Sequence, residues 1–584
     1  MVDFFRKKVV KKYLVLVVFC NDFIYLCHRE IIAKGSIMRF FFRATMSTVL
    51  ATAAMVFQTH AQEDFLLRLV GCVDSAAVAG SRCVSMIDPD NTLRTIDSVS
   101  ASLSRKKAKT YAPTVAYLRG VMYELKDSTG LAMGYYHDAL DGYKKSKDSQ
   151  RGQLRALRRM FDIHTKNGTT DSALYCMEQG LQIYRCKRNL TDEEKADYST
   201  ICNNLAILHR QNDRLAIAEQ FYETAYHIRK ELVEKSDRYR PLWADILNNY
   251  GLYFLDINDS DLAIYYLTKA LEIRKGATDT VSVATPSANV IADNHDNLAY
   301  AYYMAKQPQL AAEHYENARS IRRGLVQSSE VKERCIDDYI ATIQNLAALY
   351  KQSNRSIDAL AALVELRDAL STLPYSLQPK YLEQLAATKH NIALLYGILN
   401  QRQQAVDAMN MAIKDYNLLA LADREKYLPE VAVAMNQAAN YYSTICDYEN
   451  AEKYYKKALE INTGLYADNL VEPSEVAGNL NNLGRMYYDQ SKMEDAKNCY
   501  IKARKIFDQT DPTDIKAALN KAMTNINIVM YYIYEKNSGI ADEGFQDCGK
   551  YLMEAIEILR PYLFNPSANY YHEYAKKLLD SIIK

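Results

Sequence analysis

The chain has 584 residues, more than one compact domain usually holds, so its core belongs to several domains or to a stack of repeats. Glycine (20) and proline (12) are scarce, and strand-type alternation is hard to find after residue 110, so we expect a helical chain. Lys and Arg (72) balance Asp and Glu (71) without long blocks of one sign, which excludes an electrostatic footprint for nucleic acid.

The first predicted element is a secretion signal at residues 38–61. A basic start with two arginines precedes an apolar run, and Ala61 is the small residue before the expected cleavage point. We therefore expect export, to a bacterial periplasm or a cell surface. Translation is expected to start at Met38, which leaves residues 1–37 outside the natural product. The alternative is an uncleaved anchor, so membrane association is expected only through this amino-terminal segment.

The remaining chain divides into a cap, a long repeat region and a closing segment. Residues 62–110 are expected to form short capping helices around a turn at Asp88–Asn91. A repeat fills residues 111–550, and residues 551–584 are expected to form closing helices. Two segments rich in turn-forming residues are expected to join successive hairpins: Gly276–Asn289 and Asp508–Ile515.

Nine cysteines follow residue 61, an odd number scattered along the chain. Cys72 and Cys83 are the one local pair for which a disulfide is considered, and the sequence leaves its formation open. Cys176 and Cys499 occupy equivalent places in their repeats, where a small buried residue suits helix packing. We therefore expect core thiols at these two places and no redox role.

The repeat is clearest at Asn203–Ala225 and Asn481–Ala503. An aliphatic residue is followed by a small one and, three residues later, by an aromatic. An alanine lies thirteen residues after the start, with a large apolar residue four places and a small one seven places beyond it. These offsets put one apolar stripe on each of two successive helices, with small residues where the helices approach closely. The ten alanines are Ala132, Ala173, Ala218, Ala263, Ala311, Ala359, Ala405, Ala451, Ala496 and Ala541.

One amphipathic hairpin cannot bury its stripe alone, so ten hairpins are expected to stack into a continuous core. The recurring aromatic residue is expected mostly in that core, with His164 and His209 replacing it in two units. The aromatic residues are Tyr123, Phe254, Tyr302, Tyr350, Tyr396, Tyr442, Tyr487 and Tyr532.

The pattern resembles the tetratricopeptide repeat, whose Leu-Gly, Tyr, Ala, aromatic, Ala signature it matches over roughly residues 110–560. Successive alanines are 41 to 48 residues apart, longer than the common period of about 34. With its Asn-Asn-Leu-Ala starts, the repeat type is similar to that of kinesin light chains. The resemblance implies an all-α, tetratricopeptide-like α-solenoid, a right-handed superhelix of helical hairpins. It also implies a worn last unit, in which Cys548 takes the final alanine place.

An amide side chain directly precedes the leading aliphatic residue in eight consecutive units. In the family, the first helix of each hairpin lines the concave groove, where such an amide can offer a donor and an acceptor to an extended peptide. The alternative is that each amide bonds to a neighbouring helix and holds the stack in register. We call these residues the amide ladder: Asn204, Asn249, Asn297, Asn345, Asn391, Gln437, Asn482 and Asn527.

The surroundings of the ladder suggest binding and not catalysis. The family's clamp for a terminal carboxylate is not expected, because no lysine lies four residues before any ladder amide. Asp245 and Asp293 occupy that place in two units and are expected to favour a basic ligand. No motif for a metal, a phosphate or a nucleophile is found, so we expect no enzyme activity and no cofactor.

The leading hypothesis is an exported protein–protein interaction scaffold that binds a peptide or a partner protein in its concave groove. One alternative is a glycan-binding outer-membrane protein, for which a lipidated cysteine, exposed tryptophans and long loops are expected. The chain has a single tryptophan, Trp243. The other alternative is a sensor module of a signalling system whose output lies on another chain.

Overall fold

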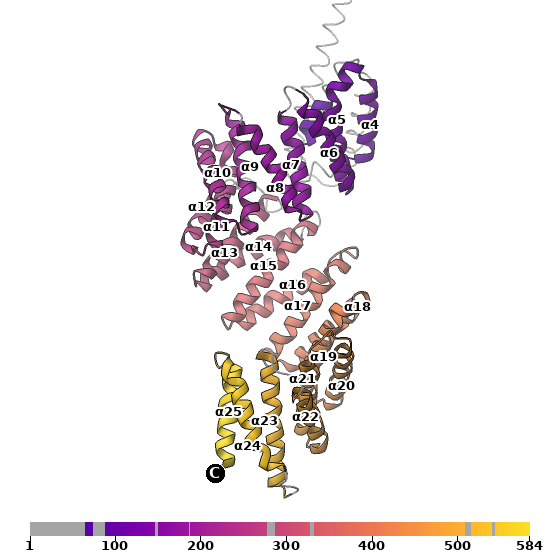
Figure 1. Cartoon of the computed structure of the whole chain (residues 1–584), viewed down its shortest axis with the longest axis vertical. Coiled ribbons are helices and arrows are strands. Elements are labelled where there is room, and N and C mark those ends of the chain that lie inside the picture. The colour runs from indigo at the N-terminus through magenta and orange to yellow at the C-terminus, as the bar shows by residue number, and fades with distance from the viewer. Residues whose placement is uncertain are drawn as a thin grey trace, which may run out of the picture. The chain divides into compact units, whose positions relative to one another are not determined.

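The computed structural model describes residues 65–73, 88–146, 150–185, 187–276, 286–327, 332–508, 515–539 and 544–583. Every regular element in these ranges is a helix (Figure 1), so the predicted all-α class is confirmed. The chain divides into two compact units, Met1–Thr280 and Val281–Lys584. Each unit is a stack of two-helix hairpins, which is the architecture of an α-solenoid.

The first unit contains a capping helix followed along the chain by four hairpins. Residues 65–73 form a further helix before the capping helix. The capping helix is α4 (Pro89–Ser102). The hairpins are α5 (Arg105–Leu125) with α6 (Thr129–Lys144), α7 (Gln150–Lys166) with α8 (Thr170–Arg185), α9 (Asp192–Gln211) with α10 (Leu215–Lys235), and α11 (Arg240–Asp256) with α12 (Ser260–Gly276).

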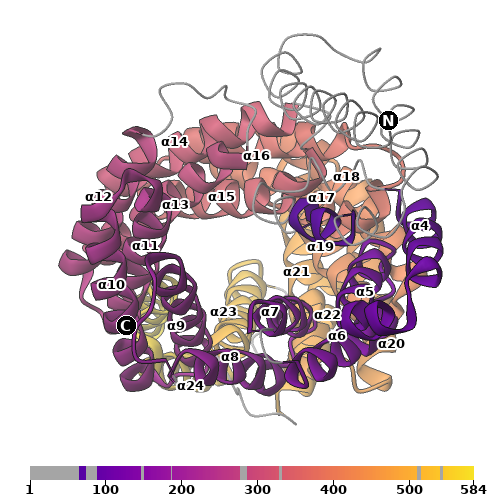
Figure 2. The same ribbon diagram turned by 90° about the horizontal axis from the view of Figure 1, so that it is seen from above.

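The second unit contains six hairpins and a closing helix, and α14, α15, α16 and α17 follow one another in Figure 2. The hairpins are α13 (Pro286–Met304) with α14 (Pro308–Gln327), α15 (Lys332–Gln352) with α16 (Ser356–Ser371), α17 (Gln378–Ile398) with α18 (Arg402–Ala422), α19 (Arg424–Thr444) with α20 (Tyr448–Ala467), α21 (Pro473–Asp489) with α22 (Met493–Asp508), and α23 (Ile515–Asn537) with α24 (Cys548–Leu559). The closing helix is α25 (Pro566–Ile583).

The hairpin turns share one backbone feature. In each of the ten hairpins, one residue between the two helices has a positive φ. In the first nine hairpins this residue lies five residues before the alanine of the repeat. In the same nine hairpins the next backbone N–H then bonds back to the carbonyl of the recurring aromatic or histidine residue, as Asp259 N does to Phe254 O at 2.8 Å. The ten residues are Asp127, Gly168, Asp213, Asn258, Lys306, Asn354, Asn400, Cys446, Ser491 and Gly539.

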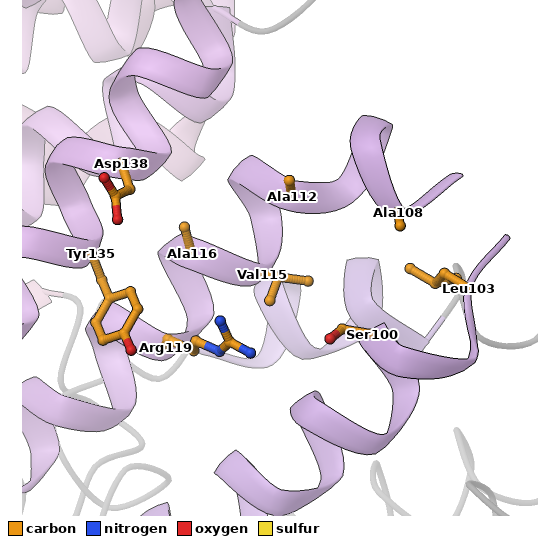
Figure 3. A pocket seen from close by; sticks show the side chains of 9 residues that line it. All are labelled: Ser100, Leu103, Ala108, Ala112, Val115, Ala116, Arg119, Tyr135 and Asp138. Carbon is orange, nitrogen blue, oxygen red and sulfur yellow. The ribbon is translucent and has the colours of Figure 1, made fainter. Parts of the chain in front are cut away.

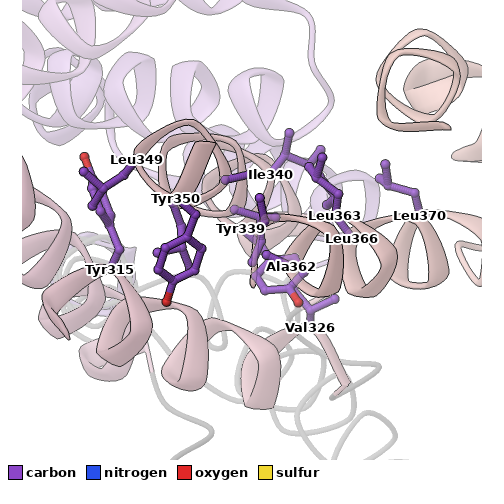
Figure 4. Close-up of a cluster of buried hydrophobic side chains, with 14 of the residues drawn as sticks. Tyr315, Val326, Tyr339, Ile340, Leu349, Tyr350, Ala362, Leu363, Leu366 and Leu370 are labelled. Atoms are coloured by element: carbon purple, nitrogen blue, oxygen red, sulfur yellow. The ribbon is translucent and has the colours of Figure 1, made fainter. Parts of the chain in front are cut away.

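The small residues predicted at the helix crossings are required by close packing. A Cβ atom on Gly120 would lie 2.6 Å from Tyr136 Cε1, and one on Gly251 would lie 2.7 Å from Leu267 Cγ. The alanines thirteen residues into the pattern are fully buried wherever the structure describes them. Figure 4 shows the result in the second unit, where side chains of α14, α15 and α16 point toward one another.

The recurring aromatic residues are buried less completely than predicted. Phe254, Tyr350 and Tyr487 are buried, whereas the other five are half-buried. Several of them stack on an aromatic residue of the second helix. The His209 ring, which replaces the aromatic, stacks in the same way on Phe221, with ring centroids 5.7 Å apart.

The cap differs from its prediction at Asp88–Asn91. These residues form no separate turn; Asp88 caps α4, and its carboxylate accepts from the backbone N–H groups of Asp90 (3.1 Å) and Asn91 (3.3 Å). The expected loop Gly276–Asn289 is shorter than predicted, because α13 already begins at Pro286.

The tenth hairpin also differs from its prediction. Ala541 lies outside the described residues, and Cys548 occupies the alanine place, because Leu552 and Ala555 follow it at the usual four- and seven-residue offsets and all three are fully buried. The second helix of this hairpin therefore begins at Cys548, three residues before the expected closing segment.

The described cysteines include both predicted core thiols. Cys176 and Cys499 are buried, and burial raises the pKa of each thiol to about 11, so both stay protonated. Cys83 lies outside the described residues, so the disulfide considered between Cys72 and Cys83 is not tested. The expected secretion signal also lies outside them, within residues 1–64.

Candidate functional site

All eight ladder amides lie on the first helix of a hairpin. Two belong to the first unit, on α9 and α11, and six belong to the second, on α13, α15, α17, α19, α21 and α23. Seven of them are half-buried, whereas Asn345 on α15 is exposed to solvent.

Three ladder asparagines bond to the hairpin before their own. Asn249 Nδ2 donates to Asn203 Oδ1 at 3.1 Å, and Asn527 Nδ2 donates to Asn481 Oδ1 at 3.0 Å. Asn482 donates in the same way to Asn436, at 3.3 Å. The acceptor always directly precedes the previous ladder place, 46 residues earlier in the chain. These amides therefore join successive first helices.

The other half-buried members also have partners. Gln437 Oε1 lies 2.6 Å from His390 Nε2, which again directly precedes the previous ladder place. Asn391 Nδ2 donates to Ala387 O of its own helix at 3.0 Å, and Asn204 Oδ1 accepts from Asn203 Nδ2 at 3.5 Å. Asn297 has an interaction partner as well.

Asn345 is the exception. The acceptor place before it is held by Asp296, whose Oδ2 accepts from Thr342 Oγ1 at 2.9 Å and from the Arg322 guanidinium, while its buried Oδ1 has no hydrogen-bond partner among the described residues. Burial raises the pKa of Asp296, and the Arg322 charge opposes that shift. Within the described part of the chain, the Asn345 side chain makes no hydrogen bond. Its amide N–H and carbonyl groups face solvent.

The carboxylates expected to favour a basic ligand are paired within the protein. Arg274 on α12 bonds to Asp245 at 2.9 Å, and Arg322 on α14 bonds to Asp293 at 2.5 Å. Both arginines lie eleven residues after the alanine of their hairpin, as does Arg229, which is 1% exposed. The charge of these two aspartates is thus neutralised by the second helix, which weakens the case for a basic ligand.

Exposed, uncharged side chains occupy positions three or seven residues after a ladder amide on α13, α15 and α17. Three and seven residues after a ladder amide, α13 presents Tyr300 (47% exposed) and Met304 (37%), and α17 ends with Ile398 (65%). On α15, Ala348 is exposed beside Asn345. This apolar surface was not predicted from the sequence. Its residues follow the ladder amides at helical offsets of three and seven residues, which is the signal that could have identified it. We call these five residues the Asn345 surface.

The first unit has a separate pocket between α4, α5 and α6 (Figure 3). Its lining is mostly apolar. Arg119 is its one cationic lining residue; it bonds to Asp97 at 2.7 Å and lies 6.0 Å from the centroid of the Tyr135 ring. No ladder amide reaches this pocket.

The described residues contain neither a candidate metal site nor a candidate membrane span. No group of three or more His, Cys, Asp and Glu side chains is arranged to hold a metal ion. No helix in the described ranges combines the length and the apolarity needed to cross a membrane.

Family models of the tetratricopeptide repeat match residues 199–238, 432–464 and 476–507. These ranges fall on the hairpins α9–α10, α19–α20 and α21–α22. The chain contains tetratricopeptide repeats. The predicted tetratricopeptide-like solenoid is therefore confirmed, and the same repeat architecture recurs in hairpins that the family models do not match.

Several solved structures are similar to the chain at low identity. The apo form of RapI is 15% identical, with 70% of this chain and 97% of that chain covered and a TM-score of 0.41. A putative kinesin light chain from P. anserina is 18% identical, with 39% and 99% covered and a TM-score of 0.30. At these values the likeness concerns the repeat fold alone. No curated protein matches the chain.

Proposed function

We propose that the protein is an exported scaffold that binds a peptide or a partner protein on the Asn345 surface of α13, α15 and α17. The observation that carries this proposal is the exposed Asn345 amide, the one ladder member whose side chain is not engaged within the described residues. Tetratricopeptide repeats form extended surfaces that commonly bind other proteins.

The physical case rests on the pairing of one polar group with apolar neighbours. A primary amide has both donors and an acceptor, so Asn345 can bond to one peptide unit of an extended chain. Tyr300, Met304 and Ile398 lie on the neighbouring first helices and offer apolar area for the side chains of that segment. Contact area from aromatic and aliphatic side chains provides most of the binding free energy in such interfaces.

Site-specific crosslinking in the native cell tests the proposal. A photocrosslinking amino acid at Asn345 is expected to capture a protein partner. The matched control carries the same amino acid at Ala361, an exposed position on α16 of the same hairpin. Capture of a defined partner at Asn345 and not at Ala361 supports the proposal, and equal capture at both positions, or none at Asn345, contradicts it.

Export is proposed from the residue pattern at 38–61 and has its own test. Mass spectrometry of the protein isolated from its native cell is expected to give a mature amino terminus at Gln62, recovered from outside the cytoplasm. An amino terminus at Met1 or Met38 on protein recovered from the cytoplasm contradicts export and leaves the binding proposal intact.

A further inference from the structure

The first unit carries a cluster of aromatic rings that the amide ladder does not use. Tyr226 on α10 lies 4.9 Å from Trp243, 6.0 Å from Tyr250 and 6.1 Å from Tyr266, measured between ring centroids. The rings of Tyr250 and Tyr266 are 5.2 Å apart. Trp243 and Tyr250 belong to α11 and Tyr266 to α12, so three helices meet here. We call these four residues the aromatic patch.

The aromatic patch is open to solvent at its edge. Tyr250 forms its base, at 7% exposed, whereas Tyr226, Trp243 and Tyr266 are each half-buried. The faces of aromatic rings are electron-rich, and a cation that lies over them is attracted. This protein already makes such a contact beside the patch, where Lys269 Nζ lies 4.1 Å from the centroid of the exposed Tyr265 ring.

Two carboxylates border the patch along α10. Glu219, Glu223 and Tyr226 follow one another at offsets of four and three residues, which places them on one side of the helix. Neither carboxylate forms an ion pair with a described residue. Like charges four residues apart repel each other, so this pair is unfavourable without a cation.

The two carboxylates lie close enough to act on the aromatic residues. Burial, and then the charge of Glu223, raise the pKa of Tyr250. Burial, and then the charge of Glu219, raise the pKa of Tyr253 to about 12. Lys269 is the nearest cation on α12, and its ammonium group is engaged with Tyr265. Glu219 also accepts a hydrogen bond from Tyr253. The patch therefore combines partly exposed aromatic rings with two carboxylates that form no ion pair with a described cation.

We infer that the aromatic patch with Glu219 and Glu223 is a second binding surface, which accepts an arginine side chain of a partner protein. A guanidinium group stacks flat on tyrosine and tryptophan rings while its N–H groups bond to carboxylates, and both partners are present here. This surface is bordered by carboxylates, whereas the Asn345 surface is uncharged, so it binds a basic segment and not an apolar one.

Trp243 is the only tryptophan of the chain, so its fluorescence reports on this surface alone. The full mature chain is titrated with a short Gly-Arg-Gly-Arg-Gly peptide and, in parallel, with the same peptide carrying citrulline, a neutral isostere, for arginine. A saturable change in Trp243 emission with the arginine peptide only is expected. No change, or an equal change with the citrulline peptide, overturns the inference.

Paired variants separate the site from general surface charge. Glu223→Gln is expected to raise the titration midpoint by about fivefold. Glu234→Gln removes one carboxylate from an exposed position farther along the same helix and is expected to leave the midpoint unchanged. Equal effects of the two variants would show that net charge, and not this surface, attracts the peptide, and would overturn the inference.

Discussion

Two regions of the second unit join their hairpins by different chemistry. From α19 to α23 neutral amides join the first helices, as Asn482 is joined to Asn436 and Asn527 to Asn481, in addition to an ion pair between Lys516 on α23 and Glu475 on α21. From α13 to α16 charged groups make the connections instead. There Arg322 bonds to Asp296 and Thr342, and Arg319 bonds to Glu365 at 2.5 Å.

The difference teaches that one sequence pattern can have two roles. Where amides join neighbouring hairpins, the ladder side chain forms a hydrogen bond to the preceding hairpin. Where the acceptor place is held by Asp296, which bonds to Arg322 and Thr342, the ladder residue Asn345 is exposed to solvent. An exposed amide can therefore arise in a repeat protein without any change of the ladder residue itself.

The largest predicted effect is common to both regions and concerns helix packing. Gly484 and Ala347 occupy the same small-residue place, on α21 and α15, and a Cβ on Gly484 would lie 2.8 Å from Tyr500 Cε1. Gly484→Leu and Ala347→Leu are each expected to lower the free energy of unfolding by about 2–3 kcal/mol. Urea denaturation measures this. Gly464→Ala, where a Cβ meets nothing within 4 Å, is the control and should not destabilise.

A smaller effect concerns the pH dependence of the region from α13 to α16. Glu365 on α16 is half-buried, which raises its pKa, but bonds from Arg319 and Tyr339 outweigh burial and hold that pKa below the ordinary 4.5. A carboxyl with a lowered pKa stabilises the fold at neutral pH and loses that contribution as the pH falls below 4.5. Glu365→Gln is thus expected to cost about 1–2 kcal/mol at pH 7 and progressively less in acid.

Hydrogen exchange at a series of pH values checks this expectation region by region. In the unmodified protein, helices α14 to α16 should lose protection as the pH falls below 4.5, and in Glu365→Gln this loss should be smaller. Glu460→Gln, at an exposed position on α20, is the control and should behave like the unmodified protein. Equal acid sensitivity of α14 to α16 in the unmodified protein and in Glu365→Gln would contradict this role of Glu365.

The smallest effect is a gain in stability at the turns. Lys306 and Ser491 have φ angles of 58° and 60°, a region that costs most side chains about 1 kcal/mol but is open to glycine. Lys306→Gly and Ser491→Gly are expected to raise the free energy of unfolding by up to about 1 kcal/mol. Thermal denaturation compares them with Lys414→Gly, a helix-interior control that should destabilise. A loss at Lys306 would contradict the account of the turns.

The sequence predicted the fold well because the packing has a period that residues display directly. The alanine at the helix crossing, the small residue opposite it and the aromatic residue at the helix end all follow from that period. The turn conformation was not predicted, because eight of its ten positions are not glycine. The tenth hairpin was placed wrongly at Ala541, since a longer turn shifts the pattern to Cys548.

The candidate site could be predicted only as a set of positions. The ladder residues were identified by their position in the repeat. Which of them form hydrogen bonds within the stack depends on partners 46 residues away, such as Asn203 for Asn249 and Asn481 for Asn527. The pairing of Asp293 with Arg322 likewise joins two helices whose side-chain geometry no local pattern gives. Sequence periodicity thus predicts which residues share a helix face. The hydrogen bonds and ion pairs between helices determine which of these residues hold the stack together.

The most direct test of the central claim compares Asn527→Ala with Asn345→Ala in urea denaturation. Asn527→Ala leaves the Asn481 carbonyl, on a residue 2% exposed, without its donor. It is expected to lower the free energy of unfolding by about 1–2 kcal/mol, whereas Asn345→Ala should change it by less than about 0.5 kcal/mol. Equal losses in the two variants would show that Asn345 also serves the stack and would contradict its assignment to ligand binding.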